Sequence, residues 1–257
     1  MTEQDENQAT DSFEVVESEK HGQRHKGIYL LPNLITTGAL FAGFYAIVAA
    51  MNGDFENAAI AIVVAGILDG MDGGVARLTN TQSKFGAEYD SLSDCVAFGV
   101  APGLVAYSWA LTDLGKVGWA AAFVYVACAA LRLARFNVQS GSTDKRFFIG
   151  LPSPSGAGLV ATMVWFGASR GITDGNDVAW IAAILTAGAG MLMVSNVQYH
   201  SFKEYHIGRV PMRVLLGVII AFAIVLLDPP LVLLSVALIY IGSGPVLDVL
   251  RRRRSST

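Results

Sequence analysis

The sequence has little charge for its length. Asp, Glu, Lys and Arg make up 15% of the 257 residues, hydrophobic residues make up 53%, and the mean hydropathy is +0.48. Soluble globular domains carry about 25% charged residues and a smaller apolar share. The shortage of charge therefore argues against an ordinary soluble domain and predicts an integral membrane protein.

Cysteine and histidine are scarce as well. The two cysteines, Cys95 and Cys128, lie in separate apolar segments without CxxC spacing. We expect them to be small buried side chains rather than a redox or zinc site. The four histidines lie in or beside polar stretches, where we expect solvent or lipid headgroups around them: His21, His25, His200 and His206.

The start of the sequence lacks the apolar core of a cleavable signal peptide. Residues 1–27 are polar and acidic, a composition that cannot bury a core, so we predict a disordered tail. Residues 28–250 are predicted to form one transmembrane domain, and residues 251–257 a short basic tail.

Long apolar runs fill most of the remaining sequence. A helix needs about 20 apolar residues to cross the hydrocarbon core of a bilayer, and turn-forming residues separate the runs. We predict an all-α bundle of eight transmembrane helices, at residues 33–51, 57–78, 85–111, 117–138, 154–170, 178–196, 210–227 and 231–250.

Basic residues alternate between the two sides of this arrangement. With both termini in the cytoplasm, 16 of the 18 Lys and Arg residues fall on the cytoplasmic side, and only Lys116 and Arg170 fall on the other. The positive-inside rule therefore supports an even number of spans in the cell membrane. The run Arg251–Arg254 is interpreted as part of this signal, which also attracts anionic lipid.

Four aspartates lie within this apolar chain. Asp69 and Asp72 are three residues apart, and Asp90 and Asp94 are four apart, so on helices each pair shares one face. The short link TNTQSK makes the two helices antiparallel neighbours. We therefore expect the four carboxylates to converge on one point near the cytoplasmic side of the membrane.

These carboxylates need compensation. One acid near the middle of a span costs about 2.5 to 3.5 kcal/mol, and only Arg77 and Lys84 are close in sequence. Clustered carboxylates are preferred ligands of Mg2+, Mn2+ or Ca2+, and a pair of such ions usually serves phosphate chemistry. Gly73 and Gly86 lie on the aspartate faces, where a missing side chain leaves room for a ligand.

The aspartates belong to a longer pattern, D-x2-D-G-x2-A-R-x8-G-x3-D-x3-D, which begins at Asp69 and ends at Asp94. In this pattern the sequence resembles the CDP-alcohol phosphatidyltransferases at every fixed position. The segments LPNLITTGALFAGF, ALRLARFNV, FFIGLPSPSGAG and MLMVSNVQYHSFK resemble the bacterial phosphatidylserine synthases of that family. The resemblance implies a membrane enzyme, as a homodimer, that transfers the phosphatidyl group of CDP-diacylglycerol to L-serine and releases CMP.

The resemblance also implies roles for individual residues. Asp69, Asp72 and Asp90 would bind two Mg2+ or Mn2+ ions. Asp94 would approach the same ions and act as general base on the serine hydroxyl. A guanidinium, short polar donors and a glycine suit a nucleotide pyrophosphate. The residues that would bind the CDP part are Asn33, Thr36, Gly73, Arg77 and Ser83.

The serine carboxylate needs a cationic partner. Arg132 and Arg135, three residues apart at the end of the fourth run, can face one site, and an arginine fork binds a carboxylate through two hydrogen bonds. Membrane anchoring or phosphate binding is the alternative role for both. Lys145 and Arg146, beside two phenylalanines, are interpreted as contacts to anionic headgroups.

Three alternatives stay open. A member of the same family could use glycerol 3-phosphate, an inositol phosphate or choline, and Arg132 and Arg135 would suit a phosphorylated acceptor. Intramembrane acids also occur in cation and proton transporters, but the broken-helix and inverted-repeat cues of transporters are not found. The complete set of four aspartates disfavours an inactive scaffold.

Overall fold

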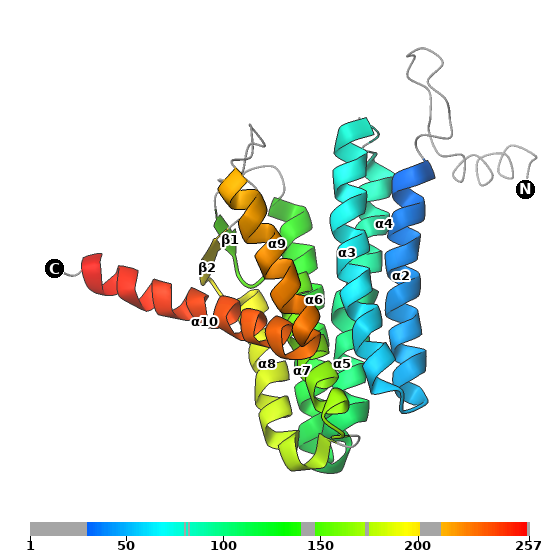
Figure 1. The fold of residues 1–257 in the computed structure, drawn as a ribbon, viewed down its shortest axis with the longest axis vertical. Helices are drawn as coiled ribbons and strands as arrows, with labels where there is room; N and C mark the ends of the chain where they lie inside the picture. Colours follow the sequence, from blue (N-terminus) through cyan, green and yellow to red (C-terminus); the bar gives the residue numbers. More distant parts are fainter. Residues whose placement is uncertain are drawn as a thin grey trace, which may run out of the picture.

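A bundle of helices forms most of the chain (Figure 1). The computed structural model describes residues 30–79, 81, 83–139, 147–172, 175–200 and 212–255. The predicted acidic tail, together with Lys145 and Arg146, lies outside these residues. The predicted helical architecture is confirmed in the described ranges, with one two-stranded sheet as an addition.

Three helical segments form the first half of the bundle. α2 (Leu30–Met51) and α3 (Phe55–Thr79) are joined by a tight turn, in which the Asp54 carboxylate accepts a hydrogen bond of 3.3 Å from the Asn57 backbone N–H and caps α3. The third segment is continuous and consists of α4 (Lys84–Asp94), the π-helical η2 (Cys95–Val100), α5 (Ala101–Ala106), the π-helical η3 (Tyr107–Leu111) and the 3-10 turn η4 (Thr112–Leu114).

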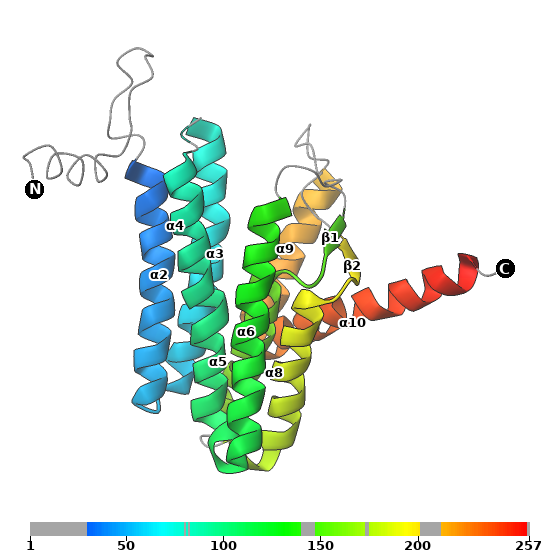
Figure 2. The ribbon, with the colours of Figure 1, turned by 180° about the vertical axis from the view of Figure 1, so that it is seen from behind.

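Five longer helices form the second half: α6 (Lys116–Gln139), α7 (Ser153–Ser169), α8 (Ala179–Val194), α9 (Met212–Leu227) and α10 (Pro229–Ser255). A short 3-10 turn, η5 (Gly175–Val178), precedes α8. α6 packs against α8, and α7 packs against both α3 and α10. Figures 1 and 2 show that α10 extends sideways out of the bundle, whereas the other long helices run along it.

A small sheet joins the segment before α7 to the segment after α8. β1 (Phe147–Ile149) and β2 (Gln198–His200) pair antiparallel, with Phe148 opposite Tyr199. Gly150 follows β1 with φ 81°, and a Cβ there would overlap the Met193 carbonyl, so this turn requires glycine. The strands were not predicted, because three residues are too few to show an alternating pattern.

Six of the described helical segments are long and apolar enough to cross a membrane: Leu31–Met51, Phe55–Thr79, Lys84–Leu114, Lys116–Val138, Gly175–Val194 and Pro229–Asp248. The chain is therefore an integral membrane protein. α7 has 17 residues and α9 has 16, which is short for a full span. Each of the eight predicted runs coincides with a helix, while the number of eight spans stays a prediction.

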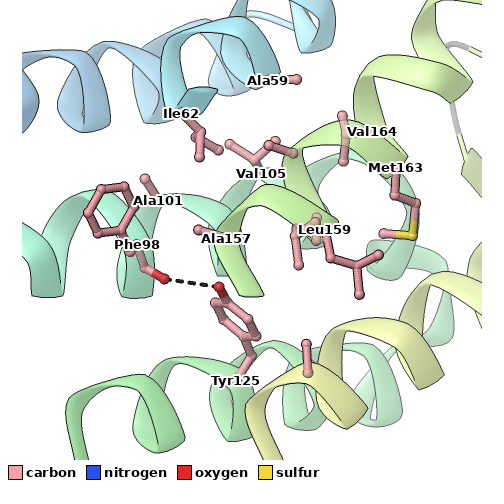
Figure 3. Close-up of a cluster of buried hydrophobic side chains, with 14 of the residues drawn as sticks. Ala59, Ile62, Phe98, Ala101, Val105, Tyr125, Ala157, Leu159, Met163 and Val164 are labelled. Carbon is pink, nitrogen blue, oxygen red and sulfur yellow. Dashed lines mark hydrogen bonds between the residues drawn. The ribbon is translucent and has the colours of Figure 1, made fainter. Parts of the chain in front are cut away.

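A buried tyrosine holds the third segment against α6 (Figure 3). Tyr125 is fully buried and donates a hydrogen bond of 2.9 Å to the Phe98 carbonyl. Because Pro102 has no N–H, this carbonyl cannot receive its usual α-helical hydrogen bond. The tyrosine therefore satisfies a backbone acceptor about one turn beyond Asp94, within the π-helical stretch.

We expect Tyr125→Phe to lower the free energy of unfolding by about 1–3 kcal/mol, because it removes this donor from a buried carbonyl. Thermal unfolding of the purified protein in detergent measures the change. The control is Tyr45→Phe, at a tyrosine that is 43% exposed, which should leave the melting temperature unchanged. A Tyr125→Phe protein as stable as the parent would contradict the role of this hydrogen bond.

Candidate metal centre

Three of the four aspartates form a compact cluster where α3 and α4 face each other. One carboxylate oxygen from each of Asp69, Asp72 and Asp90 lies within 4.8 Å of the other two. α3 supplies the first two from one face, and the antiparallel α4 supplies the third. The predicted convergence is confirmed for these three residues.

The fourth aspartate lies beside the cluster. Asp94, the last residue of α4, hydrogen-bonds to the side chain of Asp69. Its carboxylate also lies within electrostatic range of Asp72 and Asp90. Carboxylates this close cannot all stay ionised unless a cation lies between them.

The chemistry of the cluster fits a divalent metal ion. Mg2+ and Mn2+ prefer carboxylate oxygens, and three such oxygens are within one another's reach. Asp72 is 4% exposed, so little water is available to stabilise its charge. The other three aspartates are half-buried, which leaves one side of the cluster accessible. Asp69, Asp72 and Asp90 therefore form a candidate metal centre.

Thr36 on α2 contacts this centre directly. Its hydroxyl donates a hydrogen bond of 2.6 Å to Asp72 Oδ2 and lies 3.1 Å from the Pro32 carbonyl. The Thr36 carbonyl accepts a hydrogen bond of 3.2 Å from the Ser93 hydroxyl, which ties α2 to α4. Thr36 thus orients a candidate metal ligand, a contact that the predicted role in CDP binding did not include.

Two of the predicted CDP-binding residues, Asn33 and Ser83, meet at Gly86. A Cβ on Gly86 would lie 3.1 Å from Ser83 Oγ and 3.3 Å from Asn33 Oδ1. Ser83 caps α4, because its hydroxyl accepts a hydrogen bond of 2.9 Å from the Gly86 N–H. The structure brings the two polar side chains together, and they occupy the room that the sequence suggested for a ligand at Gly86.

The space expected at Gly73 is open. Among the described residues, no atom lies within 4 Å of a Cβ built at this position. Arg77, one turn further along α3, is exposed and donates from Nε to the Gly73 carbonyl at 2.9 Å. This part of α3 therefore offers open space at Gly73 and an exposed cation whose side chain reaches back to the Gly73 carbonyl.

The two arginines of α6 contact different partners. Arg132 donates from Nη1 to Ser153 Oγ in the first turn of α7, at 2.9 Å, and lies within electrostatic range of Asp94. Arg135 donates from Nη2 to Asn196 Oδ1 at 3.2 Å, after α8. The described contacts thus link Arg132 to the aspartates, while they direct Arg135 elsewhere.

A mostly apolar cavity of about 870 Å³ lies between α3, α7 and α10. Ile67 and Phe98, each within about one turn of an aspartate in sequence, are part of its wall. The polar residues in the wall include Ser155 at the start of α7 and Tyr240 on α10. The cavity is therefore an apolar space inside the membrane-spanning part, and it shares α3 with the aspartate cluster.

Three polar residues near Arg132 were not predicted from the sequence: Ser153, Ser155 and Tyr240. The two serines lie in GLPSPSG, a segment that carried a resemblance but no stated role. The sequence did not mark Tyr240 as a site residue, because tyrosines are common in the apolar runs of membrane spans.

Comparison with known proteins extends the match beyond the cluster. Residues 29–188 match the family model described as CDP-alcohol phosphatidyltransferase. A Helicobacter pylori (strain ATCC 700392 / 26695) protein named CDP-diacylglycerol–serine O-phosphatidyltransferase is 43% identical over 177 residues, 69% of this chain and 74% of its own. The protein of this name from Mycobacterium leprae (strain TN) is 35% identical over 89% of this chain and 77% of its own. The one from Bacillus subtilis (strain 168) is 35% identical over 68% of this chain and 92% of its own.

We expect Thr36→Val to weaken Mn2+ binding about 10- to 100-fold, because a methyl group cannot hold Asp72 in place. Electron paramagnetic resonance of free Mn2+, titrated with detergent-solubilised protein, measures the affinity. Thr37→Val is the matched control, since the Thr37 hydroxyl contacts the Asn33 carbonyl and Tyr89 instead. Thr36→Ser should restore binding, and parental affinity in Thr36→Val would contradict the orienting role.

Proposed function

The chain belongs to the CDP-alcohol phosphatidyltransferase family, and we propose that it transfers the phosphatidyl group of CDP-diacylglycerol to the hydroxyl of L-serine. The products are phosphatidylserine and CMP. The aspartate cluster within membrane-spanning helices is the observation that carries the proposal. The choice of serine is supported by the relatives, whose names specify this acceptor.

Asp69, Asp72 and Asp90 would hold the divalent metal, Mg2+ or Mn2+, and we propose two ions. The donor set supports this assignment, because it offers only carboxylate oxygens. When bound, the metal neutralises the pyrophosphate oxygens and stabilises the CMP leaving group. Thr36 keeps Asp72 oriented for this task.

Asp94 is the proposed general base. It lies at the side of the cluster, next to Asp69, where it can accept the proton of the serine hydroxyl. A bond forms between the serine oxygen and phosphorus while the bond from phosphorus to the CMP oxygen breaks. The hydroxyl proton passes to Asp94. Holding the reactants in line supplies much of the rate.

The CDP part is proposed to contact Asn33, Thr36, Ser83 and Arg77, with the nucleotide against the open backbone at Gly73. Arg77 suits the pyrophosphate, because a guanidinium binds phosphate oxygens through paired hydrogen bonds. The cavity between α3, α7 and α10 would receive part of the acyl chains, since its wall is mostly apolar. Both halves of a CDP-lipid would then have a place next to the metal centre.

Arg132 is the proposed partner of the serine carboxylate. Its guanidinium lies within electrostatic range of Asp94, so an acceptor bound there would present its hydroxyl to the base. α7 begins beside it at Ser153, and the N-terminus of a helix favours an anion. Arg135, bonded to Asn196, would then anchor the end of α6.

The active site is proposed to face the cytoplasm from the cell membrane. α3 ends and α4 begins at one end of the bundle (Figure 1). Arg77 and Lys84 belong to these two helix ends, and Asp72 and Asp90 lie further along the same helices. The positive-inside rule supports a cytoplasmic position for these basic residues. We also propose that both termini face the cytoplasm and that the protein is a homodimer, as the family resemblance implies.

Release of CMP tests the reaction. Purified protein with CDP-diacylglycerol and Mg2+ or Mn2+ should release CMP when L-serine is added, and little with glycerol 3-phosphate, an inositol phosphate or choline. Chelation of the metal should abolish release. CMP with only another acceptor would contradict the serine assignment, and no CMP with any acceptor would contradict the transferase itself.

The role of Asp94 has its own test. We expect Asp94→Asn to bind CDP-diacylglycerol with near-parental affinity and to release CMP at least about 100-fold more slowly, because the amide cannot accept the proton. Equilibrium binding of labelled CDP-lipid and the initial rate measure the two effects. Glu88→Gln, an exposed acid on the same helix, is the control and should react normally. Unchanged turnover in Asp94→Asn would exclude it as the base.

A further inference from the structure

The guanidinium of Arg132 has more hydrogen-bonding capacity than its described neighbours use. Nη1 donates to Ser153, but no described residue accepts a hydrogen bond from the buried Nε. A buried donor without an acceptor costs free energy, and on a charged group the cost is higher. With one described hydrogen bond, the guanidinium needs further contacts to hold it in place if it is to bind a ligand near Asp94.

Tyr240 of the last helix lies near this arginine. Its hydroxyl shares a hydrogen bond with the Ser155 side chain and lies within electrostatic range of Arg132. Tyr240 and Ser155 both belong to the wall of the cavity between α3, α7 and α10. α10 therefore contributes a phenol to the region between this cavity and the arginine.

The ring of Tyr240 is held by Tyr199 of β2. The two ring centroids are 5.6 Å apart, and the Tyr199 hydroxyl donates to the Ile241 carbonyl at 3.2 Å. A Cβ on Gly244 would overlap the Tyr199 ring, so α10 lies directly against it. Burial raises the pKa of Tyr199 to about 12, so its phenol stays neutral. Tyr240 is thus fixed by the protein rather than free to turn toward lipid.

We propose that Tyr240 is a positioning residue of the acceptor site, which holds the Arg132 guanidinium ready for the carboxylate of the amino-acid acceptor. This inference rests on the proposed function, because that function supplies the acceptor. Ser153 of α7 accepts a hydrogen bond from one end of the guanidinium. The hydrogen-bonded pair of Tyr240 and Ser155 lies in the cavity wall, with Tyr240 within electrostatic range of the arginine. Two elements that are distant in sequence thereby preorganise one cation.

Preorganisation matters here because arginine is flexible. A free guanidinium loses side-chain entropy when it binds a carboxylate, whereas one already held in place loses less. The phenol also limits which acceptors fit, since it closes one side of the site with a neutral group rather than with a second cation. An acceptor with one carboxylate is therefore favoured over one with a doubly charged phosphate.

Steady-state kinetics of Tyr240→Phe test the inference. The ring remains, so packing against Tyr199 is retained, and only the hydroxyl is lost. We expect the KM for L-serine to rise about five- to tenfold, because the variant loses one hydrogen bond. The KM for CDP-diacylglycerol should stay within about twofold. Ser155→Ala should raise the serine KM in the same direction, because it removes the partner of the phenol.

The control is Tyr45→Phe, which removes a hydroxyl from an exposed tyrosine of α2 and should leave the serine KM unchanged. A parental serine KM in both Tyr240→Phe and Ser155→Ala would overturn the inference, as would an equal rise in the KM of both substrates. If the parent releases CMP only with another acceptor, the proposed function and this inference both fall. If the parent uses serine and the variants match it, only the inference about Tyr240 falls.

Discussion

Four carboxylates are held close together inside an apolar bundle, and their mutual repulsion is the constraint that the rest of the structure must satisfy. Asp69, Asp72 and Asp90 each bring an oxygen within 4.8 Å of the others, and Asp94 hydrogen-bonds to the first of them. An acid within a membrane span is expensive, and several acids at this spacing multiply the cost. A divalent cation at the candidate metal centre would convert the repulsion into attraction, which would explain why a chain with so little charge keeps four acids together.

The surrounding elements make this arrangement rigid. Thr36 ties α2 to the most buried aspartate and, through its carbonyl, to Ser93 on α4. Beyond Asp94 the third segment changes to π-helical geometry, and Tyr125 satisfies the Phe98 carbonyl that Pro102 cannot serve. π-helical turns often occur at functional sites. Here the irregular stretch begins directly after the proposed base, so the tyrosine supports the helix that carries it.

Much of the fold and of the candidate metal centre could be predicted from the sequence. Apolar runs of this length are easy to recognise in the sequence, and each predicted run coincides with a helix. Spacings of three and four residues put the aspartates on shared faces, and the short link between α3 and α4 brought the faces together. The short run at residues 154–170 already indicated a helix as short as α7. The three-residue strands could not be predicted, because their pairing depends on contacts between distant segments.

The acceptor side of the site was harder to predict for the same reason. Sequence spacing suggested that Arg132 and Arg135 share one site. In the structure Arg132 donates to Ser153 on α7, whereas Arg135 donates to Asn196 after α8. The sequence placed Gly86 on the same helix face as the aspartates, but it could not show which side chains surround this glycine. In the structure Asn33 and Ser83 fill the space that we expected for a ligand. Tyr240 enters through the packing of α10 on α7, which no local pattern encodes.

The central claim is that the aspartate cluster is a metal centre for a CDP-lipid. Anomalous diffraction at the manganese edge, from crystals grown with Mn2+ and CDP-diacylglycerol, tests it most directly. We expect two manganese peaks next to carboxylate oxygens of Asp69, Asp72 and Asp90, together with the bound nucleotide. A bound nucleotide with no manganese peak at these aspartates would contradict it.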